Sequence, residues 1–402
     1  MRILLRTLVV TVAAAVMPVA ASAGQLGGTI VDQSTQQSLT APGWSVTPSL
    51  LFSRMYDDNV LLRLPGDQTI EDYVNIVNPR GEVTYHGRLS DFSAQYNGSF
   101  VAYRQATTLN SYDQQGGMTA KRRLSKRNTF FFSATAQESP TTELLAFVGV
   151  PYIRVGSFTD SASAGVETLV NKRLTIVTTA TFQQARFDQN QFASLLLGGN
   201  SIGGAIALRE QLTARTTLTA DADFQHATIG TSGDVFDIEN GTVGLDHELT
   251  RNMHVFAAGG ISRLDVSAFG PTRVGPSWRV GLSDHYRGTI IDLGFFRSYV
   301  PSFGFGGTMQ NEEANASIKM PLTRRIYVQG VVSRRNEDAL VFTIPSLRST
   351  WIQAVLGYAA SNWVHIEGYY AGTRQTIGVP NELLGHDQVG VQVIASKPLR
   401  IR

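Results

Sequence analysis

A short polar turn recurs along this chain at nearly constant spacing, each time between two segments of alternating apolar and polar residues. Its eight copies are Leu89-Ser90, Leu124-Ser125-Lys126-Arg127, Val170-Asn171-Lys172-Arg173, Leu212-Thr213-Ala214-Arg215, Leu249-Thr250-Arg251-Asn252, Tyr286-Arg287-Gly288, Leu322-Thr323-Arg324-Arg325 and Ala360-Ser361-Asn362. Their centres, near residues 88, 126, 171, 213, 250, 287, 323 and 361, lie 36 to 45 residues apart. Such a period requires a repeating supersecondary unit. Because a longer connection separates the two strand-like segments of each interval, the pattern predicts an all-β fold, a transmembrane antiparallel up-and-down β-barrel.

Alternation within the segments supports the barrel. Phe92, Ala94 and Tyr96, for example, interleave with Ser93 and Gln95. In a barrel wall, successive side chains face lipid and lumen in turn. A soluble β-sandwich would alternate too, with its apolar set inward. The difference in length between turns and loops favours the barrel.

Each of the eight turns joins two strands, and one further strand is expected at each end of the chain. The expected total is about eighteen strands. The expected strands are 44–56, 73–86, 91–104, 111–123, 128–138, 158–170, 174–187, 199–211, 215–228, 235–249, 253–265, 274–286, 289–299, 311–321, 325–336, 347–359, 362–374 and 387–399. The apolar set of strand 235–249 changes phase between Ile238 and Val243, which predicts a β-bulge near Asn240-Gly241.

The start of the chain predicts export. Residues 1–23 combine Arg2 and Arg6, an apolar run over 8–19 and the small residues Ala21-Ser22-Ala23, the pattern of a cleaved signal peptide. Residues 24–43 are expected to be a flexible periplasmic lead-in, and residues 44–402 the outer-membrane barrel. We therefore expect the cell outer membrane as location, with outer-membrane lipid and the barrel-assembly machinery as partners.

Composition agrees with this class. Charged residues make up 16% of the chain, below the roughly 25% of soluble domains, and cysteine is absent. The formal net charge of +2 gives no indication of a nucleic-acid partner. Aromatic residues near the expected strand ends predict girdles at the two membrane interfaces. These are Trp44, Phe52, Tyr56, Tyr85, Phe187, Trp278, Tyr286, Tyr299, Trp351, Trp363 and Tyr370.

The segment Tyr56-Asp57-Asp58-Asn59-Val60 after the first strand, the Leu-Ser/Thr-x-Arg turns and the ending Pro398-Leu399-Arg400 resemble the β-barrel porin 2 family. The resemblance covers about residues 44–402. It implies an outer-membrane barrel connected with bacterial exopolysaccharide or surface-polymer systems, without fixing a cargo.

Patterns of catalytic or cofactor sites are missing from the sequence. None of the seven histidines has the spacing H-E-x-x-H, and no Gly-x-Ser-x-Gly elbow occurs. Asp246-His247-Glu248 is expected to be a solvated turn flank. The oxygen donors of Asp57-Asp58-Asn59 could bind Ca²⁺, but a turn with side-chain caps is the favoured interpretation. We expect no enzyme activity, no cofactor and no metal.

Function is expected in the lumen. By strand phase, six basic and seven acidic residues are pore-lining candidates: Arg80, Glu82, Lys121, Arg123, Glu167, Arg209, Asp221, Asp223, Arg279, Asp292, Glu313, Lys319 and Glu367. This balance predicts ion pairs within the wall rather than a ring of one sign.

The longest connection, residues 138–157, carries the apolar run 144–148 and either folds into the lumen or extends the wall as a hairpin. If it folds inward, Glu138, Glu143 and Arg154 are the candidates for a constriction. The sequence thus predicts a passive porin for small hydrophilic solutes or an exopolysaccharide-related cargo. The alternative is a non-conducting scaffold whose outer loops bind a partner or a surface polymer.

Overall fold

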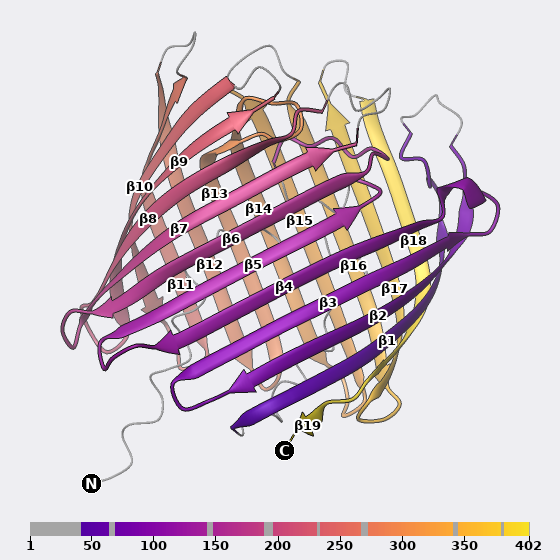
Figure 1. The fold of residues 1–402 in the computed structure, drawn as a ribbon, viewed down its shortest axis with the longest axis horizontal. Coiled ribbons are helices and arrows are strands. Elements are labelled where there is room, and N and C mark those ends of the chain that lie inside the picture. The colour runs from indigo at the N-terminus through magenta and orange to yellow at the C-terminus, as the bar shows by residue number, and fades with distance from the viewer. Residues whose placement is uncertain are drawn as a thin grey trace.

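The computed structural model describes residues 42–63, 69–142, 148–188, 196–230, 234–266, 272–340, 345–378 and 382–401. They form one antiparallel sheet that closes on itself, with loops at one end and tight turns at the other (Figure 1). The strands are β1 (Gly43–Asp57), β2 (Asp72–His86), β3 (Ser90–Tyr103), β4 (Ser111–Arg123), β5 (Asn128–Ser139), β6 (Ser157–Leu169), β7 (Leu174–Phe187), β8 (Gly199–Gln211), β9 (Thr216–Ile229), β10 (Asp234–Glu248), β11 (Met253–Val266), β12 (Arg273–Tyr286), β13 (Thr289–Pro301), β14 (Thr308–Pro321), β15 (Ile326–Ala339), β16 (Leu347–Ala359), β17 (Val364–Ile377), β18 (Glu382–Ser396) and β19 (Leu399–Ile401).

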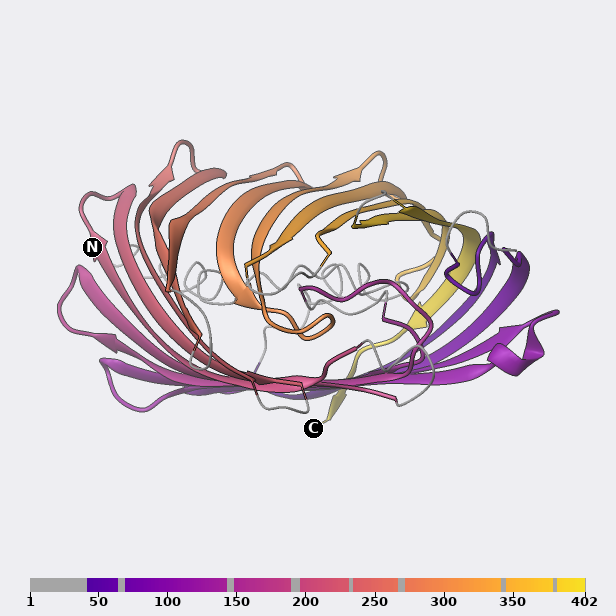
Figure 2. The ribbon, with the colours of Figure 1, turned by 90° about the horizontal axis from the view of Figure 1, so that it is seen from above.

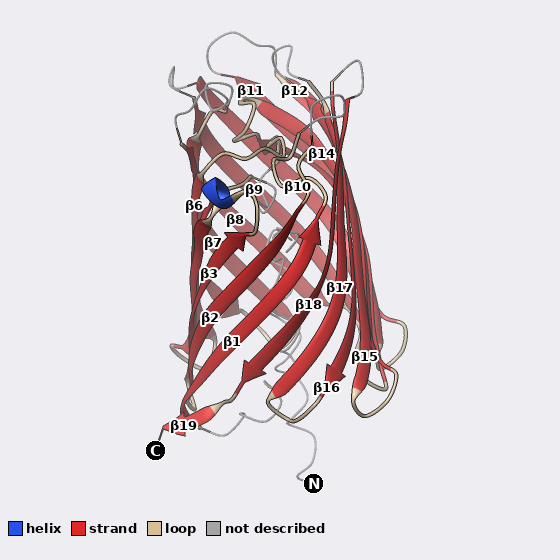
Figure 3. Cartoon of the chain, turned by 90° about the vertical axis from the view of Figure 1, so that its right-hand side faces the viewer, coloured by secondary structure: helices blue, strands red, loops and turns tan. Residues whose placement is uncertain are grey.

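Each strand pairs with its neighbours in sequence, and β1 pairs with both β2 and β18 to close the wall (Figure 3). The short strand β19 continues the pairing of β18 with β1 in the same register, after an interruption at Pro398. Proline has no N–H for the ladder, which explains the interruption. The fold is therefore the predicted closed barrel of eighteen strands.

The predicted strand ends agree with the structure to within three residues, except at β18, which begins at Glu382 rather than at residue 387. The predicted signal peptide and most of the lead-in lie outside the described residues. The described part also contains a single-turn 3₁₀ helix, η1 (Thr107–Leu109). Within the described ranges, no helix is long and apolar enough to cross a membrane.

The recurring polar turns have a common hydrogen-bond pattern. At 124–128, the Ser125 hydroxyl accepts from the backbone N–H groups of Arg127 and Asn128 at 3.1 and 3.0 Å. Asn171, Thr250, Thr323 and Ser361 cap their own turns in the same way. A side-chain oxygen that takes up two backbone donors stabilises a sharp turn without a longer loop, which accounts for the repeated Ser, Thr or Asn. The turn between β12 and β13 differs: Arg287 and Gly288 both have positive φ, as in a two-residue I′ hairpin.

The outer face of the wall carries an apolar band. Leu50, Phe100, Ile202 and Val389 point outward from different strands and are 51, 54, 60 and 55% exposed. An exposed apolar band that runs over many neighbouring strands is suited to contact with lipid. Trp44, Phe52 and Tyr286 of the predicted girdles are exposed, as expected. The girdle assignment is wrong for Phe187, Tyr299 and Trp351, which are buried inside the barrel.

Strand β10 likewise has apolar side chains that point into the barrel near the loop end. Its pairing with β9 and with β11 is continuous in register, so the predicted bulge near Asn240-Gly241 is absent. Instead Phe236 and Ile238 point inward and are fully buried, whereas Val243 and Leu245 point outward. The apolar side of the strand changes because the wall extends beyond the outer apolar band at the loop end.

Above the apolar band the outer face is charged, with Arg263 paired to Glu239 and Asp265 at 3.4 and 2.6 Å. The inner face there is apolar and packs against loops. Along a single strand, the apolar side chains therefore lie on the outer face within the apolar band and on the inner face near the loop end.

Candidate functional site

Residues 148–156 of the third loop lie inside the barrel and contact the opposite wall (Figure 2). The backbone N–H of Tyr152 donates to the side-chain oxygen of Gln375 on β17 at 2.7 Å. The Gln375 amide nitrogen donates in turn to the Val150 carbonyl at 3.4 Å and to the Ser349 hydroxyl at 3.1 Å. Gln375 is buried, so one amide side chain of the wall fixes the inner end of the loop.

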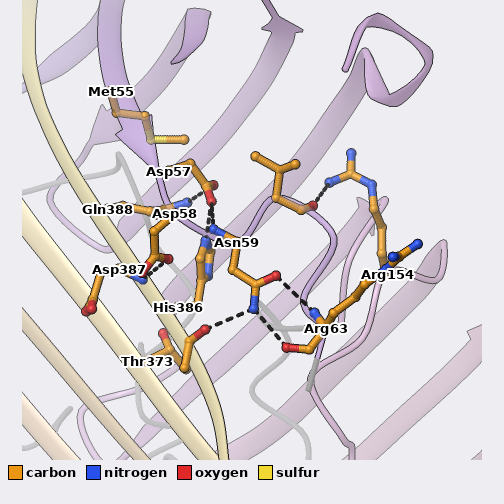
Figure 4. Close-up of polar contacts among 12 residues, drawn as sticks. Met55, Asp57, Asp58, Asn59, Arg63, Arg154, Thr373, His386, Asp387 and Gln388 are labelled. Atoms are coloured by element: carbon orange, nitrogen blue, oxygen red, sulfur yellow. Dashed lines mark hydrogen bonds and ion pairs between the residues drawn. The ribbon is translucent and has the colours of Figure 1, made fainter. Parts of the chain in front are cut away.

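Arg154 fixes the base of the same loop to the near wall. Its guanidinium donates to the Val60 carbonyl at 3.0 Å, the Tyr103 hydroxyl at 3.1 Å and the Leu109 carbonyl at 2.9 Å. It also lies over the Tyr103 ring, 5.0 Å from its centre. One side chain therefore joins the third loop to the first two loops. Figure 4 shows Arg154 beside the segment that follows β1.

The tip of the β13–β14 hairpin also folds into the lumen, as Figure 2 shows for the orange segment. The Phe305 N–H donates to the Gly149 carbonyl at 2.9 Å, and the Leu197 N–H donates to the Gly304 carbonyl at 2.7 Å. Three loops thus join backbone to backbone. A Cβ on Gly304 would lie 2.1 Å from the Gly149 oxygen, so the approach requires glycine.

Apolar side chains from these loops fill the part of the lumen next to β7 to β11. Val150, Val155, Leu196 and Phe303 pack on Phe187 of β7, with the members of this cluster buried. A second buried cluster covers β9 to β11 and consists of Ala227, Ile229, Phe236, Ile238, Leu264, Tyr299 and Leu340. The loop end is closed by packing on this side.

A cavity remains on the other side, next to β1 to β5 and β17 to β18. The space between the atoms here measures about 1240 Å³, and part of it is open to solvent. Its lining combines hydroxyl and amide groups with apolar side chains such as Leu51, Val60 and Val101, and it includes the titratable residues Asp57, Asp113, Glu138, Arg154 and His386. Among the described residues, this cavity leaves space between the third loop and this half of the wall.

The segment Asp57-Asp58-Asn59 joins β1 to β18 at the loop end of the seam (Figure 4). The Asp57 carboxylate accepts from the Asn59 N–H at 3.0 Å, from the Gln388 amide at 2.9 Å and contacts His386 Nε2 at 2.9 Å. Asp58 accepts from the Asp387 N–H at 2.7 Å. Burial raises the pKa of the Asp58 carboxyl, and the Asp387 N–H counteracts this.

Asp57, Asp58 and His386 are the one group of possible metal ligands found among the described residues. Both Asp57 oxygens already accept hydrogen bonds from the protein. The geometry therefore fits the side-chain cap that the sequence favoured over Ca²⁺.

The strand register places the thirteen charged pore-lining candidates on the inner face. Several have partners within the wall. Glu313 accepts from Arg335 at 3.0 Å, Asp223 accepts from Asn240 at 2.9 Å, and Asp292 accepts from Ser283 at 2.7 Å. Their role along a conducting path stays a prediction.

The three constriction candidates separate in the structure. Arg154 lies at the base of the inward loop, as described. Glu138 is exposed near the end of β5 and accepts from the Gln114 amide of β4. Glu143 and most of the apolar run 144–148 lie outside the described residues.

Sequence reasoning missed Arg335, Glu337 and Gln375 on the inner wall, and the inward segment 302–307. Arg335 lies 3.6 Å from Glu337, and the Gly149 N–H donates to the Glu337 carboxylate. The run Phe303-Gly304-Phe305-Gly306-Gly307 was the available signal, because two phenylalanines on a loop need cover from water.

Comparison with known proteins gives similar folds at low identity. No family model matches the chain, and no curated protein does. The chain is similar to the solved structures of OpdO from Pseudomonas aeruginosa (TM-score 0.47, 12% identity, 89% of this chain and 98% of that one) and OccAB3 from Acinetobacter baumannii (0.43, 10%, 88% and 99%). It is also similar to the FrpB iron transporter from Neisseria meningitidis (0.47, 8%, 86% and 63%). The resemblance to the β-barrel porin 2 family stays a prediction.

Proposed function

We propose that the protein is a passive outer-membrane channel for small hydrophilic solutes. The observation that carries this proposal is the third loop, which lies inside the barrel and leaves beside it a cavity lined by polar and apolar groups. Barrels of about sixteen to eighteen strands are wide enough for an aqueous channel. A loop held across such a lumen narrows it without a separate plug domain.

The outer membrane is the proposed location, because the wall carries a lipid-facing apolar band and the charged outer rim stands beyond it. Outer-membrane lipid and the barrel-assembly machinery remain the proposed partners. A cargo related to exopolysaccharide is the finer form of the proposal, and it rests on the sequence resemblance.

Single-channel recording of the purified, refolded protein in a planar bilayer tests the proposal. We expect discrete conductance steps in KCl. A variant in which residues 148–152 are replaced by five glycines loses the Val150 and Tyr152 contacts to Gln375. Its conductance should rise, because the inner end of the loop is released. If neither protein conducts, the protein is not a channel.

The second candidate is a non-conducting scaffold whose outer loops bind a partner or a surface polymer. The close packing of Gly149, Gly304 and Leu197 favours it, because three loops that fit this tightly could close the loop end. Ion flux separates the two: a scaffold would show none in either variant.

A further inference from the structure

Three amide side chains form a row across β3, β4 and β5 on the cavity wall. Asn97 pairs with Gln115 in the β3–β4 register, and Gln115 pairs with Gln137 in the β4–β5 register. All three side chains line the cavity. Because neighbouring strands are about 4.8 Å apart, the row presents an amide at each step of that length.

This amide row has hydrogen-bonding capacity that the protein does not use. The Asn97 side-chain oxygen is buried without a partner. Among the described residues, no side-chain hydrogen bond is formed by Gln115 or Gln137. An unpaired amide in a partly enclosed site is costly unless water or a ligand satisfies it. Gln115 and Gln137 are half-buried and present their amides to the cavity, whereas the Asn97 oxygen is buried.

The charged groups of the cavity are largely compensated by the protein. Asp57 accepts from Asn59, His386 and Gln388, and the Arg154 guanidinium donates to three oxygens. Asp113 interacts electrostatically with Arg154. Glu138 also lines the cavity and accepts from the Gln114 amide at 2.5 Å. Among the described lining residues there is thus no free cation for an anionic solute, and the carboxylates Asp57, Asp113 and Glu138 already accept from protein donors.

A carboxamide offers two donors and one acceptor oxygen, and a hydroxyl offers a donor and an acceptor. Amides spaced about 4.8 Å apart match hydroxyls on non-adjacent carbons of a sugar ring. Gln353 and Tyr369 also line the cavity. Gln353 adds an amide, whereas the Tyr369 hydroxyl is already bonded to the Ser53 hydroxyl at 2.9 Å. The site is suited to a ligand with many hydroxyls and no charge.

We propose that the row of Asn97, Gln115 and Gln137 binds uncharged polyhydroxylated solutes, the class of monosaccharides and sugar alcohols. The proposal rests on the proposed function, because a solute has to enter the lumen to reach the row. The present proposal adds to that function the class of solute that the cavity would select.

Saturation-transfer NMR on the full chain in detergent tests this binding without requiring conductance. The probes are glucose and sorbitol, with gluconate and glucosamine as charged analogues of similar size. We expect transfer to glucose and sorbitol, and signals at least about fivefold weaker for the charged analogues.

The variant Asn97→Ala/Gln115→Ala/Gln137→Ala should raise the Kd for glucose by about tenfold or more. The matched control is Gln183→Ala, an inward amide of β7 outside the cavity lining, which should bind as the parent does. If the triple variant does not refold, the near-isosteric Gln115→Met/Gln137→Met variant, which lacks the amide groups, replaces it and should also bind glucose more weakly than the parent. The proposed binding site is contradicted if gluconate gives the same transfer signal as glucose, or if these variants bind glucose as tightly as the parent does.

Conductance is measured in parallel. Sugar binding without ion flux contradicts the channel and leaves the site standing. Ion flux without sugar binding contradicts the site and leaves the channel standing.

Discussion

Tyr152 and Gln375 lie 223 residues apart in the chain, yet the backbone N–H of Tyr152 donates to the Gln375 side-chain oxygen across 2.7 Å. The contact joins the third loop to the opposite wall of the barrel. It makes the width of the lumen depend on a few hydrogen bonds between loop and wall, which point mutations can remove one at a time.

Gly304→Ala should separate the loops inside the barrel. The new Cβ would lie 2.1 Å from the Gly149 oxygen, so the backbone has to move. Overpacking of this kind costs about 1–3 kcal/mol. We expect larger or noisier current steps in single-channel recordings. The control is Gly241→Ala, where a Cβ meets nothing within 4 Å; if both variants behave alike, the loop junction does not limit the current.

Asp57→Ala should weaken the seam between β1 and β18. The substitution removes the acceptor that Asp57 provides to the buried His386 and Gln388, at a cost of about 3 kcal/mol. The temperature at which the folded barrel unfolds on a denaturing gel should fall clearly. Asp91→Ala, which removes the partner of His86 in an exposed pair, is the control and should cost about 0–1 kcal/mol. Equal shifts would contradict a special role of the seam cluster.

Calcium should not stabilise the purified barrel. The Asp57 oxygens already accept from protein donors, and Asp58 accepts from the Asp387 N–H. We expect the same unfolding temperature in detergent with EDTA and with millimolar Ca²⁺. A clear rise with Ca²⁺ that disappears in Asp58→Asn would show that the cluster binds the ion after all.

Ala222→Arg should destabilise the barrel by about 2–4 kcal/mol, because the residue faces lipid between Leu218 and Phe224 on the outer side of β9. Thr219 on the inner side is only 7% exposed and is unsuitable as a control. Thr135 on β5 faces the lumen of the barrel and is exposed, so it is a suitable control position. Refolding titrations should show a small loss for Thr135→Arg; comparable losses at both positions would mean that the assigned faces are wrong.

Most of the wall could be predicted from the sequence, because period-two alternation and capped turns are local signals. The Ser125 turn and the outward Phe92, Tyr96 and Phe100 follow from neighbouring residues alone. Gln375 and Arg335 could not be predicted, since their partners on the third loop and on β14 are set by the closure of the sheet. The β-bulge in β10 was wrongly predicted because the sequence alone does not show at which residue the apolar band of the wall ends.

At the loop end of the barrel the apolar side chains point inward, and this has a consequence for the order of assembly. Phe236 and Ile238 are covered by Leu340 and Tyr299, which lie beside loops at the far end of the barrel from the turns. A chain that enters the bilayer from the turn side cannot build this core until its loops have crossed. We therefore expect the barrel to insert first as a wide, wet ring, and its lumen to narrow only afterwards, when the loops collapse in water on the far side of the membrane.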